Sequence, residues 1–388
     1  MKILHISKFY PPEPGGIETF VRDLACAQVQ QGHQVCVLAH QAGFAHKSKS
    51  ECINGVQVRR IRTLGQAAYA PVAPEFPLHL VSVLRGFRPD VVHAHLPNTS
   101  AFWLLCIKRT CPLVLHWHAD VVASPIDRKM QVLYNFYKPL EFLLLKKADR
   151  VIATSCEYLN ASRPLARFPE KTAVVPLAID PGRLRRASGR GPCTKQAESD
   201  SRFTVLSVGR FSYYKGFEYL VQAAESVPEA VFILAGDGPR YPAIQKLVAQ
   251  KGLEHRVRLP GRVDEERLRE LYASCHVFCL PSVERTEAFG IVLLEAMSFA
   301  MPLVTTSIEG SGVKEVNVHG VTGLQVPPAD PQALAEALDT LRQNKSARSR
   351  MGEQALARFR ENYEMSRLAS NPAFYGVPGC GAKAPEGA

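Results

Sequence analysis

The most informative segment of the chain is Glu284-Arg285-Thr286-Glu287-Ala288-Phe289-Gly290-Ile291-Val292-Leu293-Leu294-Glu295-Ala296. It follows an apolar run at residues 276–280, which ends at Pro281 and is typical of a buried strand in a parallel sheet. After Gly290 the pattern changes to that of a helix, so the unit is a strand, an acidic loop and a helix start. The free backbone N–H groups and the positive dipole end at such a helix start can hold an anion such as a diphosphate.

Two carboxylates flank this turn. Glu287 lies in the loop just before the helix, and Glu295 lies eight residues later, about two turns into the helix and on a similar face. Carboxylates do not bind phosphate but accept hydrogen bonds well from hydroxyl groups. An anion site between two hydroxyl binders describes a nucleotide sugar, with its sugar, diphosphate and ribose in that order.

The arrangement of a glutamate, seven residues and a second glutamate around Phe289-Gly290-Ile291-Val292 resembles the signature of the retaining glycosyltransferases of family 4. A bare pair of glutamates at this spacing would more simply belong to a buried helix with two surface carboxylates, but the strand and turn context favours the family. The resemblance implies a GT-B fold and a donor site that includes the helix start. In that site Glu287 would orient the donor sugar, Glu295 would hold the ribose, and Gly290, Ile291 and Val292 would lie at the diphosphate.

Length and composition are those of a two-domain globular protein, because 388 residues exceed the usual limit of a single core. The first seven residues are too short and too soon interrupted for a signal peptide, and no apolar run is long enough to span a membrane. The ten cysteines have no CxxC spacing, and we expect reduced thiols, several of them buried in apolar runs: Cys36, Cys106, Cys275 and Cys279. These features predict a cytoplasmic protein.

Positive charge is concentrated in the first half of the chain. Residues 1–190 contain 25 Lys and Arg against 13 Asp and Glu, a net of +12, whereas residues 191–388 contain 22 against 23, a net of −1. Such asymmetry suggests that the first half faces an anionic partner. Phospholipid, a lipid-linked diphosphate and nucleic acid all qualify as that partner, and plain solvated charge is the alternative to any partner. We favour an anionic membrane surface that meets Lys146, Lys147 and the arginines in and next to an exposed edge strand at residues 56–61: Arg59, Arg60 and Arg62. The apolar, basic-ended segment 138–147 is interpreted as a core helix with solvated ends in preference to a membrane-contacting one.

Gly15 and Gly16 stand between a first strand at residues 2–7 and an amphipathic helix at about residues 17–31. Paired glycines at this place let the backbone approach a ligand closely, although a plain tight turn would also explain them. The dinucleotide fingerprint GxGxxG is absent. In the resembled family this loop meets the donor phosphates and the acceptor, so the resemblance places Gly15 and Gly16 in the donor site.

Histidines end two further predicted strands, in Asp90-Val-Val-His-Ala-His95 and Leu113-Val-Leu-His-Trp-His118. An HxH pair places both rings on one face of a strand, but no third ligand lies nearby at the usual spacing, and we predict no metal site. Residues at the carboxyl ends of parallel strands often belong to an active site. The resemblance implies that His118 lies near the donor sugar.

Arg210 and Lys215 follow the first strand of the second half, residues 203–208, and stand between glycines. The Arg210 guanidinium can donate two parallel hydrogen bonds, and the Lys215 ammonium five residues later adds a compact positive charge. Such a pair suits a diphosphate, although solvated loop charges are an alternative. In the family this arginine and lysine hold the leaving diphosphate. Val263, after a later strand, matches a position where the family reads the base through backbone groups.

The sequence therefore predicts an α/β protein with two doubly wound Rossmann-like domains, and the resemblance implies that they form the GT-B fold. We expect an acceptor-binding domain at residues 1–182, a linker at 183–202, a nucleotide-sugar-binding domain at 203–365, and a disordered tail at 366–388. The family closes with a long helix that crosses back onto the first domain, and the composition of this tail puts that crossing in doubt.

The expected activity is retaining transfer of a hexose, with mannose or rhamnose favoured, from a nucleoside-diphosphate sugar to a glycan or a lipid-linked acceptor. The catalytic residues would be His118, Glu287, Arg210 and Lys215. No cofactor or metal is expected, since Asp-x-Asp does not occur, and a guanosine donor is favoured over a uridine donor. The resemblance is to bacterial transferases of lipopolysaccharide O-antigen or exopolysaccharide synthesis, at the inner face of the cytoplasmic membrane. Alternatives are a sugar-nucleotide epimerase or hydrolase of the same fold, a phosphorylase-like enzyme, for which no pyridoxal lysine can be placed, and a non-catalytic binder of nucleic acid or an anionic surface. No nucleic-acid-reading module is recognisable.

Overall fold

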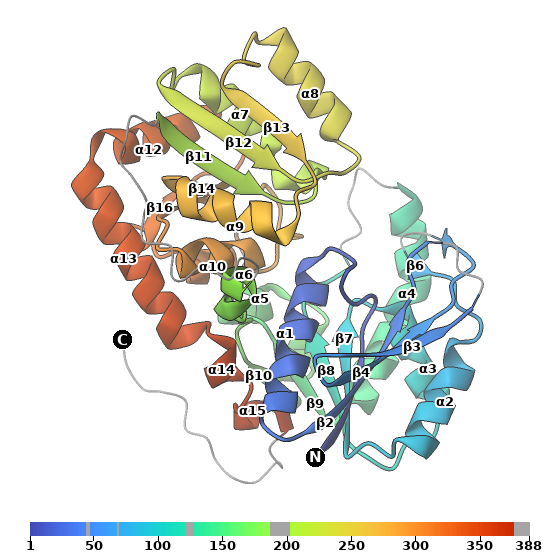
Figure 1. The fold of residues 1–388 in the computed structure, drawn as a ribbon. Helices are drawn as coiled ribbons and strands as arrows, with labels where there is room; N and C mark the ends of the chain where they lie inside the picture. Colours follow the sequence, from blue (N-terminus) through green and yellow to red (C-terminus); the bar gives the residue numbers. More distant parts are fainter. Residues whose placement is uncertain (44–46, 68–69, 122–127, 187–201, 376–388) are drawn as a thin grey trace.

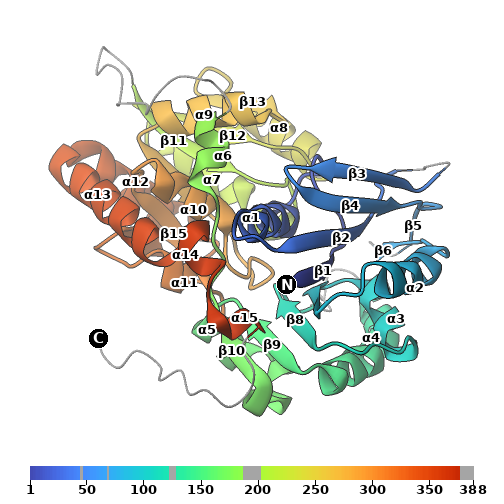
Figure 2. The same cartoon turned by 60° about the horizontal axis from the view of Figure 1, so that its bottom comes forward.

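The computed structural model describes residues 1–43, 47–67, 70–121, 128–186 and 202–375 (Figure 1). Two lobes are visible, each built on one sheet with helices around it (Figures 1 and 2). The sheets are separate: one contains strands from residues 2–174 and the other contains strands from residues 203–326. This is the doubly wound α/β architecture that the sequence predicts.

The first sheet has eight strands in the order β10-β9-β8-β7-β1-β2-β4-β3, and every pair is parallel except β3 with β4. Its strands are β1 (Lys2–Ile6), β2 (Gln34–His40), β3 (Lys49–Ile53), β4 (Val56–Ile61), β7 (Val91–Leu96), β8 (Leu113–Trp117), β9 (Arg150–Ala153) and β10 (Thr172–Val174). A short hairpin, β5 (Gln66–Ala67) and β6 (Ala70–Pro71), stands apart. The helices are α1 (Gly16–Gln30), α2 (Phe76–Gly86), α3 (Trp103–Cys106), α4 (Arg128–Lys147), α5 (Cys156–Ala161) and α6 (Pro181–Arg186).

The second sheet has six parallel strands in the order β13-β12-β11-β14-β15-β16. They are β11 (Phe203–Val208), β12 (Ala230–Ala235), β13 (Val257–Gly261), β14 (Val277–Leu280), β15 (Leu303–Thr306) and β16 (Gly323–Val326). The helices are α7 (Phe217–Glu225), α8 (Tyr241–Gln250), α9 (Glu265–Ser274), α10 (Ile291–Ser298), α11 (Val313–Val316), α12 (Pro331–Gln343) and α13 (Lys345–Asn362). Two further helices, α14 (Met365–Leu368) and α15 (Pro372–Tyr375), follow α13.

Both sheets reverse their strand order beside their first strand. In the first sheet β1 lies between β2 and β7, and in the second sheet β11 lies between β12 and β14. In open parallel sheets, ligands bind outside the carboxyl ends of the strands at such a switch point. The loops after β1, β11 and β14 carry most of the donor-site residues that the sequence predicts, so the topology gathers them at these two points.

Strand β4 is not an edge strand, and this prediction was wrong. The antiparallel strand β3 pairs along its outer side. Arg60 is only 6% exposed and donates hydrogen bonds to the carbonyl oxygens of Tyr10 and Pro11 and to the Glu51 carboxylate. Arg60 therefore ties the loop after β1 to the sheet and does not face a partner.

A second correction concerns Cys106, which is exposed, whereas Cys36, Cys275 and Cys279 are buried as expected. Cys106 is the last residue of the four-residue helix α3, in which Leu104 is the buried residue.

The last helices cross back onto the first domain, so the prediction of a disordered tail was wrong for residues 366–375. Figure 1 shows α13 running down from the second domain, with α14 and α15 beside the first. The backbone N–H of Met365 donates to the carbonyl oxygen of Ile179, and the Arg150 guanidinium donates to that of Ala373. Phe374 is fully buried in the core that contains α1. The remaining residues of the predicted tail, 376–388, lie outside the described residues.

The predicted linker is also partly structured. Its first residues belong to the helix α6, which packs against α9 of the second domain, while residues 187–201 lie outside the described residues. The sequence does not predict α6 because the helix is short and because ion pairs with residues of other elements stabilise it.

Candidate active site

Lys215 and Glu287 form a buried ion pair at the carboxyl ends of β11 and β14. Glu287 also accepts a hydrogen bond from the Ser282 hydroxyl at 3.0 Å. Burial opposes the charged form of Lys215, but the carboxylate of Glu287 outweighs burial and raises the pKa of Lys215. The structure thus joins two side chains that the sequence assigns to different parts of the donor, the diphosphate and the sugar.

Two glycines make room for this pair. A Cβ on Gly209 would lie 3.3 Å from Cε of Lys215, and a Cβ on Gly216 would lie 2.1 Å from the Pro281 carbonyl oxygen. Gly216 also has a φ of 64°, a conformation that side chains other than glycine rarely adopt. The glycines that flank Arg210 and Lys215 therefore let the loop after β11 pack closely on the loop after β14.

The start of α10 faces the first domain. Gly290 precedes α10 with a φ of 80°, which turns the chain from the acidic loop into the helix. A Cβ on Gly16 would lie 3.5 Å from Cδ1 of Ile291, so the loop after β1 reaches the first turn of α10. Val292, the next residue, is half-buried. The two glycine-bearing segments that the sequence places on opposite domains thus meet.

Gly15 has a separate role, because a Cβ there would collide with the carboxylate of Glu18 at 2.0 Å. Glu18 lies in the first turn of α1, is only 9% exposed, and has a pKa that burial raises. Burial lowers the pKa of Lys8; Glu18 opposes this, and the positive charge of Arg210 adds to it. Arg210 is exposed, and its loop therefore lies near Lys8 of the first domain.

Glu295 is held by residues that the sequence analysis missed. Its Oε1 accepts from the Arg183 guanidinium at 2.5 Å, and its Oε2 accepts from the Tyr272 hydroxyl at 2.8 Å. Arg183 lies on α6 and also pairs with Glu265 and Asp23. Although burial opposes it, the carboxylates of Glu295 and Asp23 raise the pKa of Arg183. Arg183 belongs to a basic run that the sequence shows only as linker charge, so no local signal could have identified it.

Asp120 and Arg285 form an ion pair at 3.0 Å between the two domains. Asp120 lies two residues after His118, and Arg285 lies two residues before Glu287. The pair therefore brings the end of β8 to the acidic loop that the Glu287 signature contains. Two opposite charges at the predicted ends of strands are a weak signal, and spacing alone does not pair them.

Val263 is half-buried between β13 and α9, and it packs against the core cluster that also contains Ile291. Asp264, the next residue, caps α9 by accepting from the backbone N–H of Arg267. The placement of Val263 at the carboxyl end of β13 agrees with a position beside a bound base, and that role stays a prediction.

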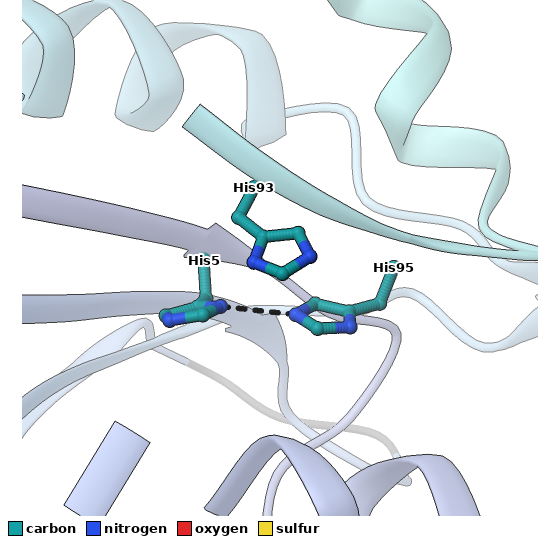
Figure 3. A group of neighbouring side chains, drawn as sticks. All are labelled: His5, His93 and His95. Carbon is teal, nitrogen blue, oxygen red and sulfur yellow. Dashed lines mark hydrogen bonds between the residues drawn. The ribbon is translucent and has the colours of Figure 1, made fainter. Parts of the chain in front are cut away.

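His118 lies in a cluster of five buried histidines from neighbouring strands: His5, His93, His95, His116 and His118. Figure 3 shows three of them, His5, His93 and His95. The argument that the HxH pairs lack a third nearby ligand was wrong, because strand pairing supplies it. Ring nitrogens of two groups of three, His5 with His93 and His95 and His95 with His116 and His118, lie within 4.8 Å of one another. Burial lowers the pKa of His118 to about 3, so its imidazole is neutral at physiological pH.

Neutral imidazoles are the form that binds a metal, but the ring orientations do not suit one ion. The His116 and His118 rings are stacked with an interplanar angle of 5°, and the His93 and His95 rings with one of 24°. In-plane lone pairs of stacked rings run side by side and do not converge on one point. The absence of a metal from the reaction stays a prediction that rests on the sequence.

The comparisons with known proteins agree with this architecture. Residues 14–183 match the family model described as Glycosyltransferase Family 4, and residues 194–358 match the model described as Glycosyl transferases group 1. The chain is 30% identical to the O-antigen chain mannosyltransferase C of Escherichia coli over 95% of this chain and 96% of that protein. It is also 30% identical to the D-rhamnosyltransferase WbpZ of Pseudomonas aeruginosa, over 93% and 92% of the two chains.

Solved structures show the same fold. Sucrose-phosphate synthase from Thermosynechococcus elongatus superposes with a TM-score of 0.76 and 22% identity, over 95% of this chain and 96% of that one. The sequence matches span both domains, and the structural match covers both sheets with the site between them. The chain therefore belongs to the group 1 glycosyl transferases of glycosyltransferase family 4, and it is a glycosyltransferase with the GT-B fold.

Proposed function

We propose that this enzyme transfers a hexose, with retention at the anomeric carbon, from a nucleoside-diphosphate sugar to a glycan or a lipid-linked acceptor. The observation that carries the proposal is the buried Lys215–Glu287 pair at the switch point of the second sheet, next to the start of α10. It sets a cation for phosphate beside a carboxylate for hydroxyl groups. Gly16, from the first domain, lies against Ile291 at the start of α10.

The leaving diphosphate is the centre of the proposed mechanism. Negative charge develops on it as the glycosidic bond breaks, and Lys215, Arg210 and the N–H groups at the start of α10 stabilise that charge. Glu287 and His118 orient the sugar, and the departing phosphate accepts the proton of the acceptor hydroxyl. None of these steps uses a protein nucleophile.

Ribose binding requires a change at Glu295. In the structure its two oxygens are occupied by Arg183 and Tyr272. We propose that the ribose hydroxyls take over the contact with Arg183 when the nucleotide binds, so that Arg183 turns to Asp23 and Glu265, with which it already pairs.

The donor and the pathway are proposed from the relatives. The E. coli relative is named for a mannosyl transfer to an O-antigen chain, and the P. aeruginosa relative for a D-rhamnosyl transfer. We therefore propose a mannose or rhamnose donor, with guanosine diphosphate favoured as the carrier, and an acceptor of lipopolysaccharide O-antigen or exopolysaccharide synthesis.

A thermal-shift panel of nucleoside diphosphates and their sugars tests the donor, because a ligand that binds only the folded protein raises its Tm. We expect guanosine diphosphate and its mannose or rhamnose conjugate to raise Tm more than the uridine, adenosine or thymidine compounds. The best donor is then incubated with lipid-linked oligosaccharide, and the anomeric configuration of the product is read by NMR. Release of free or epimerised sugar that does not depend on acceptor, or a product of inverted configuration, would contradict the proposal.

We further propose that the first domain associates with an anionic membrane surface through α4. Four apolar side chains of α4 at helical spacing are exposed by 40–73%: Leu133, Phe136, Leu140 and Leu143. The preferred interpretation of this segment as a core helix is therefore wrong for one face, although Leu144 and Leu145 are buried. The exposed lysines Lys138 and Lys146 accompany this stripe, and an apolar stripe with basic flanks suits a membrane interface. Within the described ranges, no helix has both the length and the apolar character needed to cross a bilayer.

We expect Phe136→Ser/Leu140→Ser to abolish sedimentation with anionic vesicles. Loss of the apolar contacts removes the insertion energy, and each basic residue near the surface adds only about 1 kcal/mol. Sedimentation is measured at low and at high salt, with anionic and with neutral vesicles. Leu78→Ser is the matched control, because Leu78 is 72% exposed but lies on α2. Equal vesicle binding by the α4 variant and the control would show that this surface is not the contact.

A further inference from the structure

Four of the five histidines in the cluster around His118 have no part in the proposed mechanism. His5 lies on β1, His93 and His95 on β7, and His116 on β8, and each is at most 1% exposed. The strand register sets His5 opposite His93 and His95 opposite His116. Five imidazoles in one core need an account of their hydrogen bonds, because a buried polar atom without a partner costs about 1–3 kcal/mol.

The network begins at Gln28 on α1. The Gln28 amide nitrogen donates to the Tyr375 hydroxyl oxygen at 2.9 Å, so its carbonyl oxygen faces His5 and accepts from Nε2 at 2.8 Å. With its oxygen accepting from Gln28, the Tyr375 hydroxyl gives its own proton to Nδ1 of His93, at 2.9 Å. The amide orientation thus assigns the proton of His5 to Nε2.

The position of the proton on His5 determines its position on the next rings of the network, because a neutral imidazole carries one proton and one lone pair. Burial lowers the pKa of His5 to about 4 and the pKa of His95 well below its ordinary value, so both rings are neutral. Nδ1 of His5 therefore accepts from Nε2 of His95 at 3.0 Å (Figure 3). Nδ1 of His95 accepts in turn from Nε2 of His118 at 3.0 Å.

The chain ends on the lone pair of His118. Its Nδ1 is buried and has no hydrogen-bond partner among the described residues. Exchanging the positions of the Gln28 amide nitrogen and oxygen would keep the same hydrogen-bonded pairs, but each shared proton would then belong to the other partner. In that arrangement the last proton would lie on Nδ1 of His118. The orientation of the Gln28 amide therefore determines which form of His118 the network holds, and in the structure the amide nitrogen faces the Tyr375 hydroxyl of the crossing C-terminal segment.

We infer that Gln28 and Tyr375 are positioning residues that fix His118 as the Nε2–H tautomer, the form whose Nδ1 carries a lone pair without a partner among the described residues and can accept a hydrogen bond from a hydroxyl group. The catalytic consequence rests on the proposed placement of His118 beside the donor sugar. The tautomer itself does not depend on it. A donor-only group at this place would favour phosphate, whereas an acceptor favours a hydroxyl.

The test is NMR of the nucleotide-free enzyme labelled with ¹³C and ¹⁵N at histidine, since ring shifts distinguish the two tautomers. The His118 signal is identified by its loss in His118→Asn. We expect the Nε2–H form in the wild type. Tyr375→Phe keeps the ring but removes the hydroxyl that accepts from the Gln28 amide nitrogen, and Gln28→Met keeps the length but removes the amide. Both should shift the His118 signal toward the Nδ1–H form.

Tyr363→Phe is the matched control. It removes a hydroxyl from the same crossing segment, but this hydroxyl lies near Arg358 and the Glu315 carbonyl oxygen and not near the histidines. We expect the control to leave the His118 signal in place. An Nδ1–H form in the wild type, a His118 signal unchanged in both variants, or stoichiometric zinc in the purified protein would overturn the inference.

Kinetics separate this inference from the proposed function. If both hold, Tyr375→Phe raises KM for the donor sugar by about tenfold, the loss of roughly one hydrogen bond, while Kd for the nucleoside diphosphate alone is unchanged. A tautomer shift with unchanged KM would leave the network established and remove His118 from the sugar site.

Discussion

Replacing Lys215 with alanine lowers kcat by about 10²-fold to 10³-fold, and Arg210→Ala lowers it by about 10²-fold, in line with loss of one preorganised donor to developing charge. Lys215 is 8% exposed and lies against Gly209, so its ammonium is fixed before the donor binds. Arg210 is exposed, so in the proposed mechanism it would reach the phosphate from the solvent side. The measurement is initial rate at saturating donor, with the released nucleoside diphosphate quantified.

Stability distinguishes the two variants. Lys215→Ala leaves the carboxylate of Glu287 buried without its cation, which costs about 3–5 kcal/mol of unfolding free energy, whereas Arg210→Ala changes it by about 0.5 kcal/mol or less. Lys251→Ala is the control for loss of a lysine, because Lys251 pairs with Glu225 on the surface.

Chelator should leave the wild-type rate unchanged. Activity abolished by chelator and restored by magnesium or manganese would disprove the metal-free mechanism.

We expect the two signature glutamates, Glu287 and Glu295, to have separable roles. Glu295→Gln should weaken nucleoside-diphosphate binding by about 1–3 kcal/mol, because a charged acceptor of ribose hydroxyls is lost. Glu287→Gln should leave that affinity nearly intact and lower turnover with the sugar donor. Isothermal titration calorimetry gives the affinities, and donor turnover is measured in parallel.

The ion pairs around Arg183 supply a control for this experiment. Glu265→Gln removes another carboxylate that pairs with Arg183, at 3.1 Å, and leaves both oxygens of Glu295 in place. It should therefore weaken nucleotide binding less than Glu295→Gln does. Equal losses of affinity in Glu287→Gln and Glu295→Gln would contradict the assignment of sugar to one and ribose to the other.

The strands and the site loops could be predicted because their signals are local. The apolar run at residues 203–208 is the strand β11, and the predicted helix at residues 17–31 is α1, Gly16–Gln30. The strand, acidic loop and helix start at residues 276–296 are β14, its loop and α10. Each is encoded by residues within one turn or one strand of each other, so a short window of sequence contains the information.

The contacts between distant segments could not be predicted. Arg183 reaches Glu295 across 112 positions, and nothing in either neighbourhood specifies the other. The third histidine of each group comes from a neighbouring strand, so the pattern along one strand underestimates how many rings meet. The Pro- and Gly-rich composition after residue 370 suggested disorder, but Phe374 and Tyr375 there fit against the histidines of the first domain.

The crossing of the C-terminal segment determines the order in which the two domains can be completed during synthesis. Phe374 and Tyr375 complete the first domain, yet they leave the ribosome only after the whole second domain has been synthesised. Domains of a nascent chain generally fold as units in the order of synthesis. Here the residues that complete the first domain, and that also fasten the two domains together, are synthesised after the second domain. A chain truncated within the second domain would leave the histidine cluster of the first domain without Phe374 and Tyr375.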